Sequence, residues 1–222
     1  MRFLCLHGLG TNSEIFSTQT VSLRYELGQS HSYEFLEGII PAPLAAELAA
    51  YYPASIKTWN YFDIASAASA SQALEQLHTF IALEGPFDGV IAYSHGASFA
   101  ATYIIQQATS KPFATPPFKC AIFFSAARPA DPELLAKDEL RFLDANTDGI
   151  KIGIPTTHVW GSNDNIHPGT WAYARDLSEA RLREEVVHQE GHDIPGGKAR
   201  ESLLEIAKAI RRTVARAEGT YE

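Results

Sequence analysis

The chain has 222 residues, of which 45% are hydrophobic and 20% charged, and it carries a net charge of -8. This composition is that of a globular protein long enough to enclose a pocket, so it excludes a disordered chain. Because the charge is acidic and spread along the chain, it also argues against a nucleic-acid partner. We expect one domain over residues 1–222.

The two cysteines, Cys5 and Cys120, each lie in a short apolar run, so we expect reduced core thiols and no disulfide or metal site. The first residues lead straight into His7-Gly8, which leaves no room for a secretory signal. No apolar run approaches the roughly 20 residues that span a bilayer. We therefore expect a cytoplasmic protein without a membrane partner; the sequence gives no indication of its oligomeric state.

Short apolar runs alternate with amphipathic helical patterns along most of the chain. This alternation predicts an α/β fold with a mostly or wholly parallel six-stranded sheet and helices on both faces. The expected strands are Phe3–Leu6, Tyr33–Leu36, Gly89–Tyr93, Cys120–Phe124, Thr156–Trp160 and Glu185–His188. The expected helices are Ala68–Leu83, Ala97–Ala108 and Ala199–Ala215.

The segment Ile39–Asp63 breaks the alternation, because it is rich in proline, alanine and aromatic residues. One hypothesis is a lid or a wall of a substrate pocket. The alternative is a helix and a loop that pack on the sheet edge.

The run Gly89–Tyr93 leads through Ser94 into a helical pattern, which is the strand, tight turn and helix of a nucleophile elbow. Such a turn needs small residues two positions before and after the serine, because it presses the strand and the helix together. Gly96 meets this need, and Ala92 stands where a glycine is usual. Ser94 is therefore the candidate nucleophile, although a serine at a helix start is also a common N-cap.

The loop His7–Asn12 follows the first apolar run and contains two glycines, which favours close approach of its backbone to a ligand over a simple turn. In a fold with a nucleophile elbow, two backbone N–H groups bind the oxyanion, one after the nucleophile and one from this first loop. We assign these N–H groups to His95 and Leu9.

An acid and a histidine follow the serine in the order that this fold requires. Asp164 lies in a polar loop after Thr156–Trp160, and His192 lies in a loop after the last predicted strand. We expect His192 to be the general base and Asp164 the acid that orients it, with Asp193 and Asp131 as weaker alternatives for the acid.

His188 ends a predicted strand, so packing explains it better than catalysis. The histidines are dispersed, with no pair at helical spacing beside a carboxylate, and we expect neither a metal nor another cofactor.

These motifs resemble the fungal serine hydrolase family of the α/β-hydrolase superfamily, which includes a human ovarian-cancer-associated hydrolase and hydrolases of fungal polyketide gene clusters. The departures from the family pattern are Ala92 and Glu37-Gly38, which lie near the elbow and the expected pocket. The segments that carry the resemblance are Leu6–Phe16 with Gln19, the Ser94 elbow, His158–Asp164 and Gly191–Pro195.

The resemblance implies hydrolysis of a small-molecule carboxylic ester or thioester, including release of a polyketide acyl chain from an acyl carrier protein. From the residues, Trp59, Tyr61, Phe62 and Phe124 favour an apolar acyl group and are the candidate substrate-binding side chains.

Two other functions compete. A non-hydrolytic protein of the same fold, such as a cyclase or a carrier-binding partner, would keep the elbow without turnover. A nucleotide-binding protein is disfavoured because the loop His7–Asn12 lacks the glycine spacing of that motif and no lysine follows it.

Overall fold

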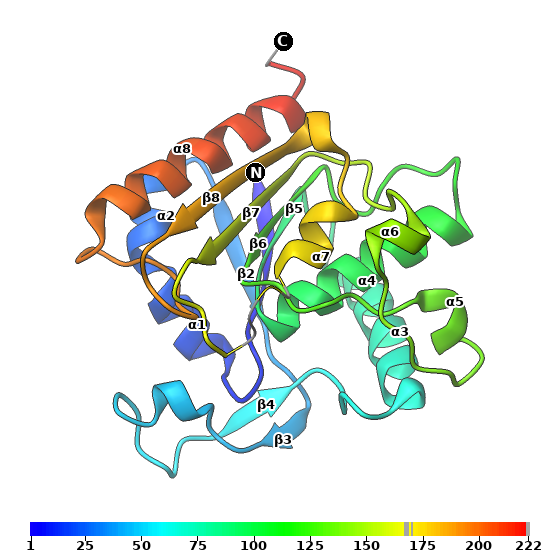
Figure 1. Cartoon of the computed structure of the whole chain (residues 1–222), viewed down its shortest axis with the longest axis horizontal. Helices are drawn as coiled ribbons and strands as arrows, with labels where there is room; N and C mark the ends of the chain where they lie inside the picture. The colour runs from blue at the N-terminus through cyan, green and yellow to red at the C-terminus, as the bar shows by residue number, and fades with distance from the viewer. Residues whose placement is uncertain (167–168, 170, 221–222) are drawn as a thin grey trace.

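A computed structural model describes residues 1–166, 169 and 171–220 of the chain. Six strands form one sheet in the order β2-β1-β5-β6-β7-β8, and every neighbouring pair is parallel (Figure 1). The predicted six-stranded sheet is confirmed, and it is wholly parallel. Its strands are β1 Arg2–Leu6, β2 Ser32–Leu36, β5 Gly89–Tyr93, β6 Cys120–Phe124, β7 Thr156–Gly161 and β8 Arg183–His188.

Helices cover both faces of the sheet (Figure 1). The three predicted helices are present as α3 Ala67–Glu84, α4 His95–Ser110 and α8 Arg200–Ala217. Shorter helices that the sequence did not signal complete the two layers, because helices this short show little periodicity. They are α1 Ser13–Gln19, α2 Val21–Leu27, α5 Pro132–Leu135, α6 Ala145–Asp148, α7 Trp171–Asp176 and the 3₁₀ helix Ala180–Leu182.

The core lies in two layers, one on each face of the sheet. Leu4, Val90 and Phe123 pack under α3 and α4, whereas Phe3 and Ile122 pack on the opposite face with α8. Every residue of β5 and of β6 is buried. Strands that are covered on both faces need apolar side chains at every position, which is why these strands read as continuous apolar runs.

The segment Ile39–Asp63 contains two short strands and a short helix that the sequence did not signal. It folds into a separate two-stranded antiparallel sheet of β3 Ile40–Ala42 and β4 Thr58–Asn60, with the 3₁₀ helix Ala46–Leu48 between them. Figure 1 shows this small sheet beyond the carboxyl ends of the main strands. The segment therefore covers the edge at which ligands bind in sheets of this type.

Backbone hydrogen bonds tie this segment to the loop after β1. The N–H of Trp59 donates to the carbonyl of Thr11 at 2.7 Å, and the N–H of Ala45 donates to the carbonyl of Gly10 at 2.9 Å. The Gly10 N–H in turn donates to Oδ1 of Asn60 at 2.9 Å. These bonds make the segment a fixed neighbour of the first loop.

Across the described ranges, we find no helix that combines the length and the apolar character needed to cross a bilayer.

The start of α4 packs directly on the end of β1, and this contact requires glycine at position 96. A Cβ atom added to Gly96 would lie 2.6 Å from the carbonyl oxygen of Leu6 and closer still to that of His7. Both atoms belong to the backbone, so they cannot move aside as a flexible side chain would. The glycine therefore sets how closely α4 approaches the first loop.

We predict that Gly96→Ala destabilises the protein, although alanine has the better helix propensity by about 1 kcal/mol. Overpacking against a fixed backbone costs about 1–3 kcal/mol and outweighs that gain. Urea unfolding of the variant against wild type measures the difference. Gly197→Ala is the matched control, because the nearest atom to its added Cβ is 3.8 Å away. Equal stability of the two variants would contradict the close-contact argument.

Candidate active site

Ser94 occupies a sharp turn between β5 and α4. Its backbone has φ 51° and ψ -114°, a conformation that residues with a side chain rarely adopt. Its N–H donates to the carbonyl of Phe124 on the neighbouring strand at 2.8 Å, and its own carbonyl accepts from the N–H of Ala97 in α4 at 3.1 Å. The turn has the strained geometry that a nucleophile elbow requires.

Three side chains from distant parts of the chain meet at this turn. Nε2 of His192 lies 2.9 Å from Oγ of Ser94, and Nδ1 of His192 lies 2.6 Å from Oδ2 of Asp164. All three residues are at least nine-tenths buried. The order serine, acid and histidine along the chain thus brings the predicted residues into one hydrogen-bonded row.

The tautomer of His192 follows from the hydrogen-bond partners of its two ring nitrogens. A carboxylate only accepts hydrogen bonds. Nδ1 of His192 therefore carries the ring proton and donates a hydrogen bond to Asp164. In the neutral ring Nε2 then has the lone pair that accepts the hydroxyl proton of Ser94. The arrangement can remove that proton when the oxygen attacks an electrophile.

The loop that carries His192 is held by groups on two strands. The hydroxyl of Tyr93, the residue before the serine, donates to the carbonyl of His192 at 2.6 Å. Gly161 at the end of β7 lies so close to the carbonyls of Glu190 and Gly191 that a Cβ there would overlap both. Contacts from the ends of β5 and β7 therefore hold the backbone of the loop that carries His192.

The two alternative acids lie elsewhere. Asp131 caps the N-terminus of α5 and forms an ion pair with Arg141. Burial raises the pKa of Asp131, but its hydrogen bonds, above all the one from Arg141, hold the pKa below its usual range. Asp193 is exposed, although it adjoins His192 in sequence. Of the three carboxylates, Asp164 is the one that meets the imidazole at 2.6 Å.

The loop after β1 lies against the serine, where the two predicted oxyanion donors belong. A Cβ added to Gly8 would lie 3.5 Å from the Cβ of Ser94. Neither the Leu9 N–H nor the His95 N–H donates a backbone hydrogen bond to the part of the chain that the structure describes. His95 is the first residue of α4, where N–H groups have no partner within the helix.

A buried polar network beneath this loop was not anticipated from the sequence. The His7 side chain is fully buried, and its Nε2 accepts the N–H of Gly38 at 3.0 Å. The hydroxyl of Tyr61 accepts the N–H of His7 at 2.8 Å and donates to the carbonyl of Leu36 at 3.0 Å. These bonds fix the backbone from which the Leu9 N–H projects.

Glu37 joins the same network from the end of β2. Its carboxylate accepts the N–H and the hydroxyl of Ser13 and lies 3.2 Å from Nε2 of His7. Burial raises the pKa of Glu37, but hydrogen bonds with His7 and Ser13 outweigh this effect and lower the pKa. Glu37-Gly38, the departure from the family pattern, thus supports the first loop.

The His95 ring packs beside the elbow without a polar contact. Its centroid lies 4.4 Å from that of Phe62, and neither ring nitrogen has a hydrogen-bond partner among the described residues. Burial, with a smaller contribution from His7, lowers the pKa of His95 to about 3. The ring is therefore neutral at physiological pH.

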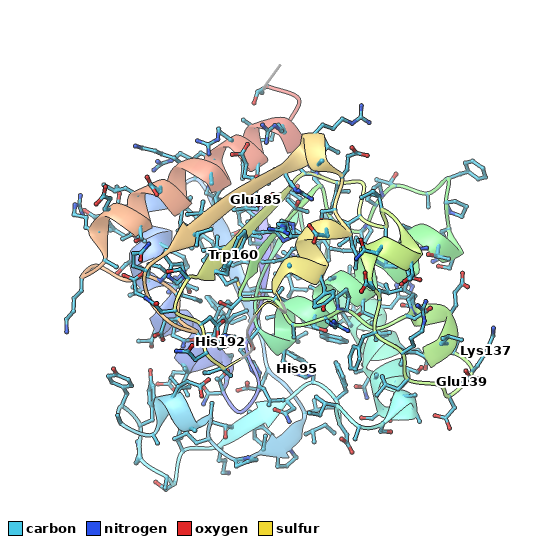
Figure 2. The ribbon with its side chains drawn as sticks, viewed as in Figure 1. His95, Lys137, Glu139, Trp160, Glu185 and His192 are labelled. Atoms are coloured by element: carbon cyan, nitrogen blue, oxygen red, sulfur yellow. The ribbon has the colours of Figure 1, made fainter. Side chains whose placement is uncertain are left out.

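The four predicted substrate-binding side chains occupy different surroundings. Trp59 and Phe62 are partly buried in and beside the small sheet, whereas Tyr61 is only 5% exposed and its hydroxyl is engaged in the network above. Phe124 is 1% exposed and packs in the core on the α8 face. Figure 2 shows His95 and His192 between the main sheet and the β3–β4 segment, the region that Phe62 shares.

His188 lies buried at the end of β8, with its Nδ1 2.9 Å from a carboxylate oxygen of Glu190. Burial lowers its pKa against the opposing effect of Glu190. No group of three or more histidine, cysteine, aspartate or glutamate side chains in the described chain is arranged to hold a metal ion.

The chain is similar in sequence to known hydrolases. The family model described as "Serine hydrolase (FSH1)" matches residues 1–202. Esterase FPY3 of Fusarium mangiferae is 39% identical over 98% of this chain and 98% of its own length. Hydrolase phiM of Fungal sp. (strain ATCC 74256) is 28% identical, over 87% of this chain and 86% of its own.

Among solved structures, SOBER1 of Arabidopsis thaliana superposes with a TM-score of 0.61 at 16% identity, over 96% of this chain and 99% of that one. At such low identity the likeness establishes the fold alone. Since the family model spans most of the sequence and a curated esterase matches nearly all of it, the chain belongs to the serine hydrolase (FSH1) family and is an enzyme of the α/β-hydrolase fold.

Proposed function

We propose that this enzyme hydrolyses carboxylic esters or thioesters through an acyl-enzyme on Ser94. The observation that carries the proposal is the continuous row from Ser94 Oγ through His192 to Asp164, with separations of 2.9 and 2.6 Å. A serine hydroxyl is a weak nucleophile until a neighbouring base takes its proton. The row supplies this base in a buried setting.

In the first half of the reaction, Ser94 Oγ attacks the acyl carbon while Nε2 of His192 takes the hydroxyl proton. The negative oxygen of the tetrahedral intermediate accepts hydrogen bonds from the Leu9 and His95 N–H groups. The intermediate collapses when the bond to the leaving group breaks, and His192 returns the proton to the departing alkoxide or thiolate. Water then attacks the acyl-enzyme with His192 again as base.

Asp164 stabilises the imidazolium that forms in each half-reaction and keeps Nδ1 protonated. Its own carboxylate also accepts the N–H of Ile166 at 3.1 Å, so the side chain is held in one orientation. This support explains how a loop aspartate can serve as a positioned acid.

The segment Ile39–Asp63 serves in this proposal as a fixed pocket wall. Its hydrogen bonds to Gly10 and Thr11 argue against a freely moving lid. Behind Tyr61 and Phe99 lies a mostly apolar cavity of about 240 Å³, and Phe99 also packs on Phe62 with ring centroids 5.6 Å apart. An apolar acyl chain that passes Phe62 would point toward this cavity.

We further propose that the leaving group is the thiol of an acyl carrier protein. The resemblance to hydrolases of fungal polyketide gene clusters supports this leaving group. The apolar surroundings of Phe62 suit a long acyl chain. The two buried free thiols, Cys5 and Cys120, support a reducing compartment such as the cytoplasm.

Replacement of the serine tests the nucleophile. Ser94→Ala should lower kcat by roughly 10⁴-fold or more on both an oxygen ester and the matched thioester of the same acyl group. The fold should persist, because the change removes one hydroxyl and opens no apolar cavity. Steady-state hydrolysis and circular dichroism measure the two effects. Retention of a tenth of the wild-type rate by the folded variant would refute the role of Ser94.

Replacement of the carboxylates separates the candidate acids. Asp164→Asn should lower kcat by roughly 10⁴-fold, because the amide cannot stabilise the imidazolium and favours the wrong tautomer. The matched control Asp193→Asn should stay close to the wild-type rate, since that side chain is exposed. The comparison uses the same ester at saturating concentration. A larger loss for Asp193→Asn would move the acid to the histidine's own loop.

Acyl-chain selectivity tests the pocket wall. Phe62→Ala should lose about 10–200-fold more kcat/KM on a decanoyl ester than on an acetyl ester, since the lost contact matters only when substrate fills it. Tyr61→Phe should affect both esters alike, because its hydroxyl supports the first loop and touches His7 and Leu36. If Phe62→Ala also reduced both rates equally, the side chain would have a structural role.

A further inference from the structure

A second cavity lies at the amino ends of the main strands, whereas Ser94 lies at their carboxyl ends. It has a volume of about 380 Å³ and is lined by the C-terminal halves of α3 and α4, the loop 111–117 before β6 and the residues 151–154 before β7. These segments all lie at the amino ends of the strands, because α3 and α4 run antiparallel to them. A molecule bound there would not compete for the catalytic turn.

Most of the cavity wall is apolar and rigid. Ile81 and Ile104 project from the two helices, and Pro116 and Pro117 form the facing loop. Deeper in the wall, Tyr103 is 1% exposed and its hydroxyl lies 2.9 Å from Nδ1 of His78. Proline restricts the backbone of the facing loop, and the buried phenol is held by its partner.

The charge of this wall is opposite to that of the protein. Lys111 and Lys151 line the cavity, and its lining contains no aspartate or glutamate among the described residues, although the chain has 26 acidic and 18 basic residues. Neither lysine forms an ion pair within the described part of the chain. Both side chains are exposed, so each ammonium is available to an anion at the mouth of an apolar cavity.

We propose that this cavity is a second binding site, specific for an amphipathic carboxylate that consists of an apolar chain with one terminal carboxylate. The apolar chain would lie against Ile81, Ile104 and the prolines, and burial of its methylene groups supplies most of the affinity. The carboxylate would sit between the two lysines. The volume falls within the range of about 300–1,000 Å³ that small-molecule sites occupy.

A carboxylate suits this wall better than a larger polyanion. The two lysines are separate point charges, and the described cavity lining offers no arginine fork of the kind that binds phosphate through paired hydrogen bonds. An apolar carboxylic acid is also the class of molecule that an esterase releases. The site would therefore bind the acid product without occupying the catalytic turn.

Direct binding tests the proposal with decanoate as the probe, measured by isothermal titration calorimetry on the whole protein. We expect the double variant Lys111→Gln with Lys151→Gln to bind decanoate about 2–30-fold more weakly, the effect of two exposed ion pairs. Higher salt should weaken decanoate binding to wild type and reduce the difference in affinity between wild type and the double variant. The control Lys137→Gln with Lys208→Gln removes the same charge from exposed positions outside the cavity lining and should leave the affinity unchanged.

A steric variant locates the apolar chain independently of charge. Ala108→Trp places an indole in the cavity from an exposed position of α4; it should abolish decanoate binding at this cavity and leave any binding at the acyl pocket beside Phe62 unchanged. The matched control Ala68→Trp lies exposed near the other end of α3 and should bind as wild type. Three outcomes would each overturn the proposal. They are absence of decanoate binding to wild type, equal affinity of wild type and Ala108→Trp for decanoate, and tighter binding of decyl phosphate than of decanoate. None of these outcomes depends on turnover, so they leave the role of Ser94 untouched.

Discussion

The close contact between the start of α4 and the end of β1 is the constraint on which the site depends. Gly96 lets the helix approach the carbonyls of Leu6 and His7, and this approach is what turns the chain sharply enough to hold Ser94 at φ 51°. A strained residue of this kind costs about 1–3 kcal/mol and persists only where surrounding contacts overdetermine it. Here the hydrogen bond from the Ser94 N–H to Phe124 and the packed helix supply those contacts.

The same contact brings the first loop against Ser94, so the loop needs its own support. His7 is fully buried, and a buried imidazole is tolerated because the Gly38 N–H donates to Nε2 and Nδ1 lies 2.8 Å from the carbonyl oxygen of Gly8. The Tyr61 hydroxyl adds a link between the loop and the end of β2. A polar network in this position rigidifies the first-loop backbone, including the Leu9 N–H that we propose as an oxyanion donor.

Polar groups without partners gather at this edge of the sheet. The His95 nitrogens and the Ser125 hydroxyl are buried and have no hydrogen-bond partner among the described residues. Ser125 follows β6 and also has a positive φ of 43°, so two strained serines stand at the ends of adjacent strands. Unsatisfied groups and strain cost stability, and folds concentrate both where function needs them. The described residues that line the apolar cavity at the amino edge show neither feature.

Local sequence was sufficient for the sheet and the main helices, and it singled out the three residues of the hydrogen-bonded row. Apolar runs reveal strands that are buried on both faces, and the strand, serine and helix pattern reveals the elbow, because both depend on neighbours in the chain. The parallel order of strands then brings Asp164 and His192 to the same edge as Ser94. Chain order predicted that meeting, with Asp193 and Asp131 left as weaker alternatives for the acid.

Only the tertiary structure decided which carboxylate meets the imidazole and how residues 39–63 are folded. Asp193 is nearer to His192 in sequence, but its side chain faces solvent, and sequence distance says nothing of that direction. The small sheet of residues 39–63 and the Tyr61 hydroxyl bond likewise depend on contacts with β1 and β2, far away along the chain. Phe124 reads as a pocket residue from its place at a strand end, yet the alternation of the strand points it into the core on the α8 face. Side-chain direction and long-range hydrogen bonds arise from packing, so no local pattern specifies them.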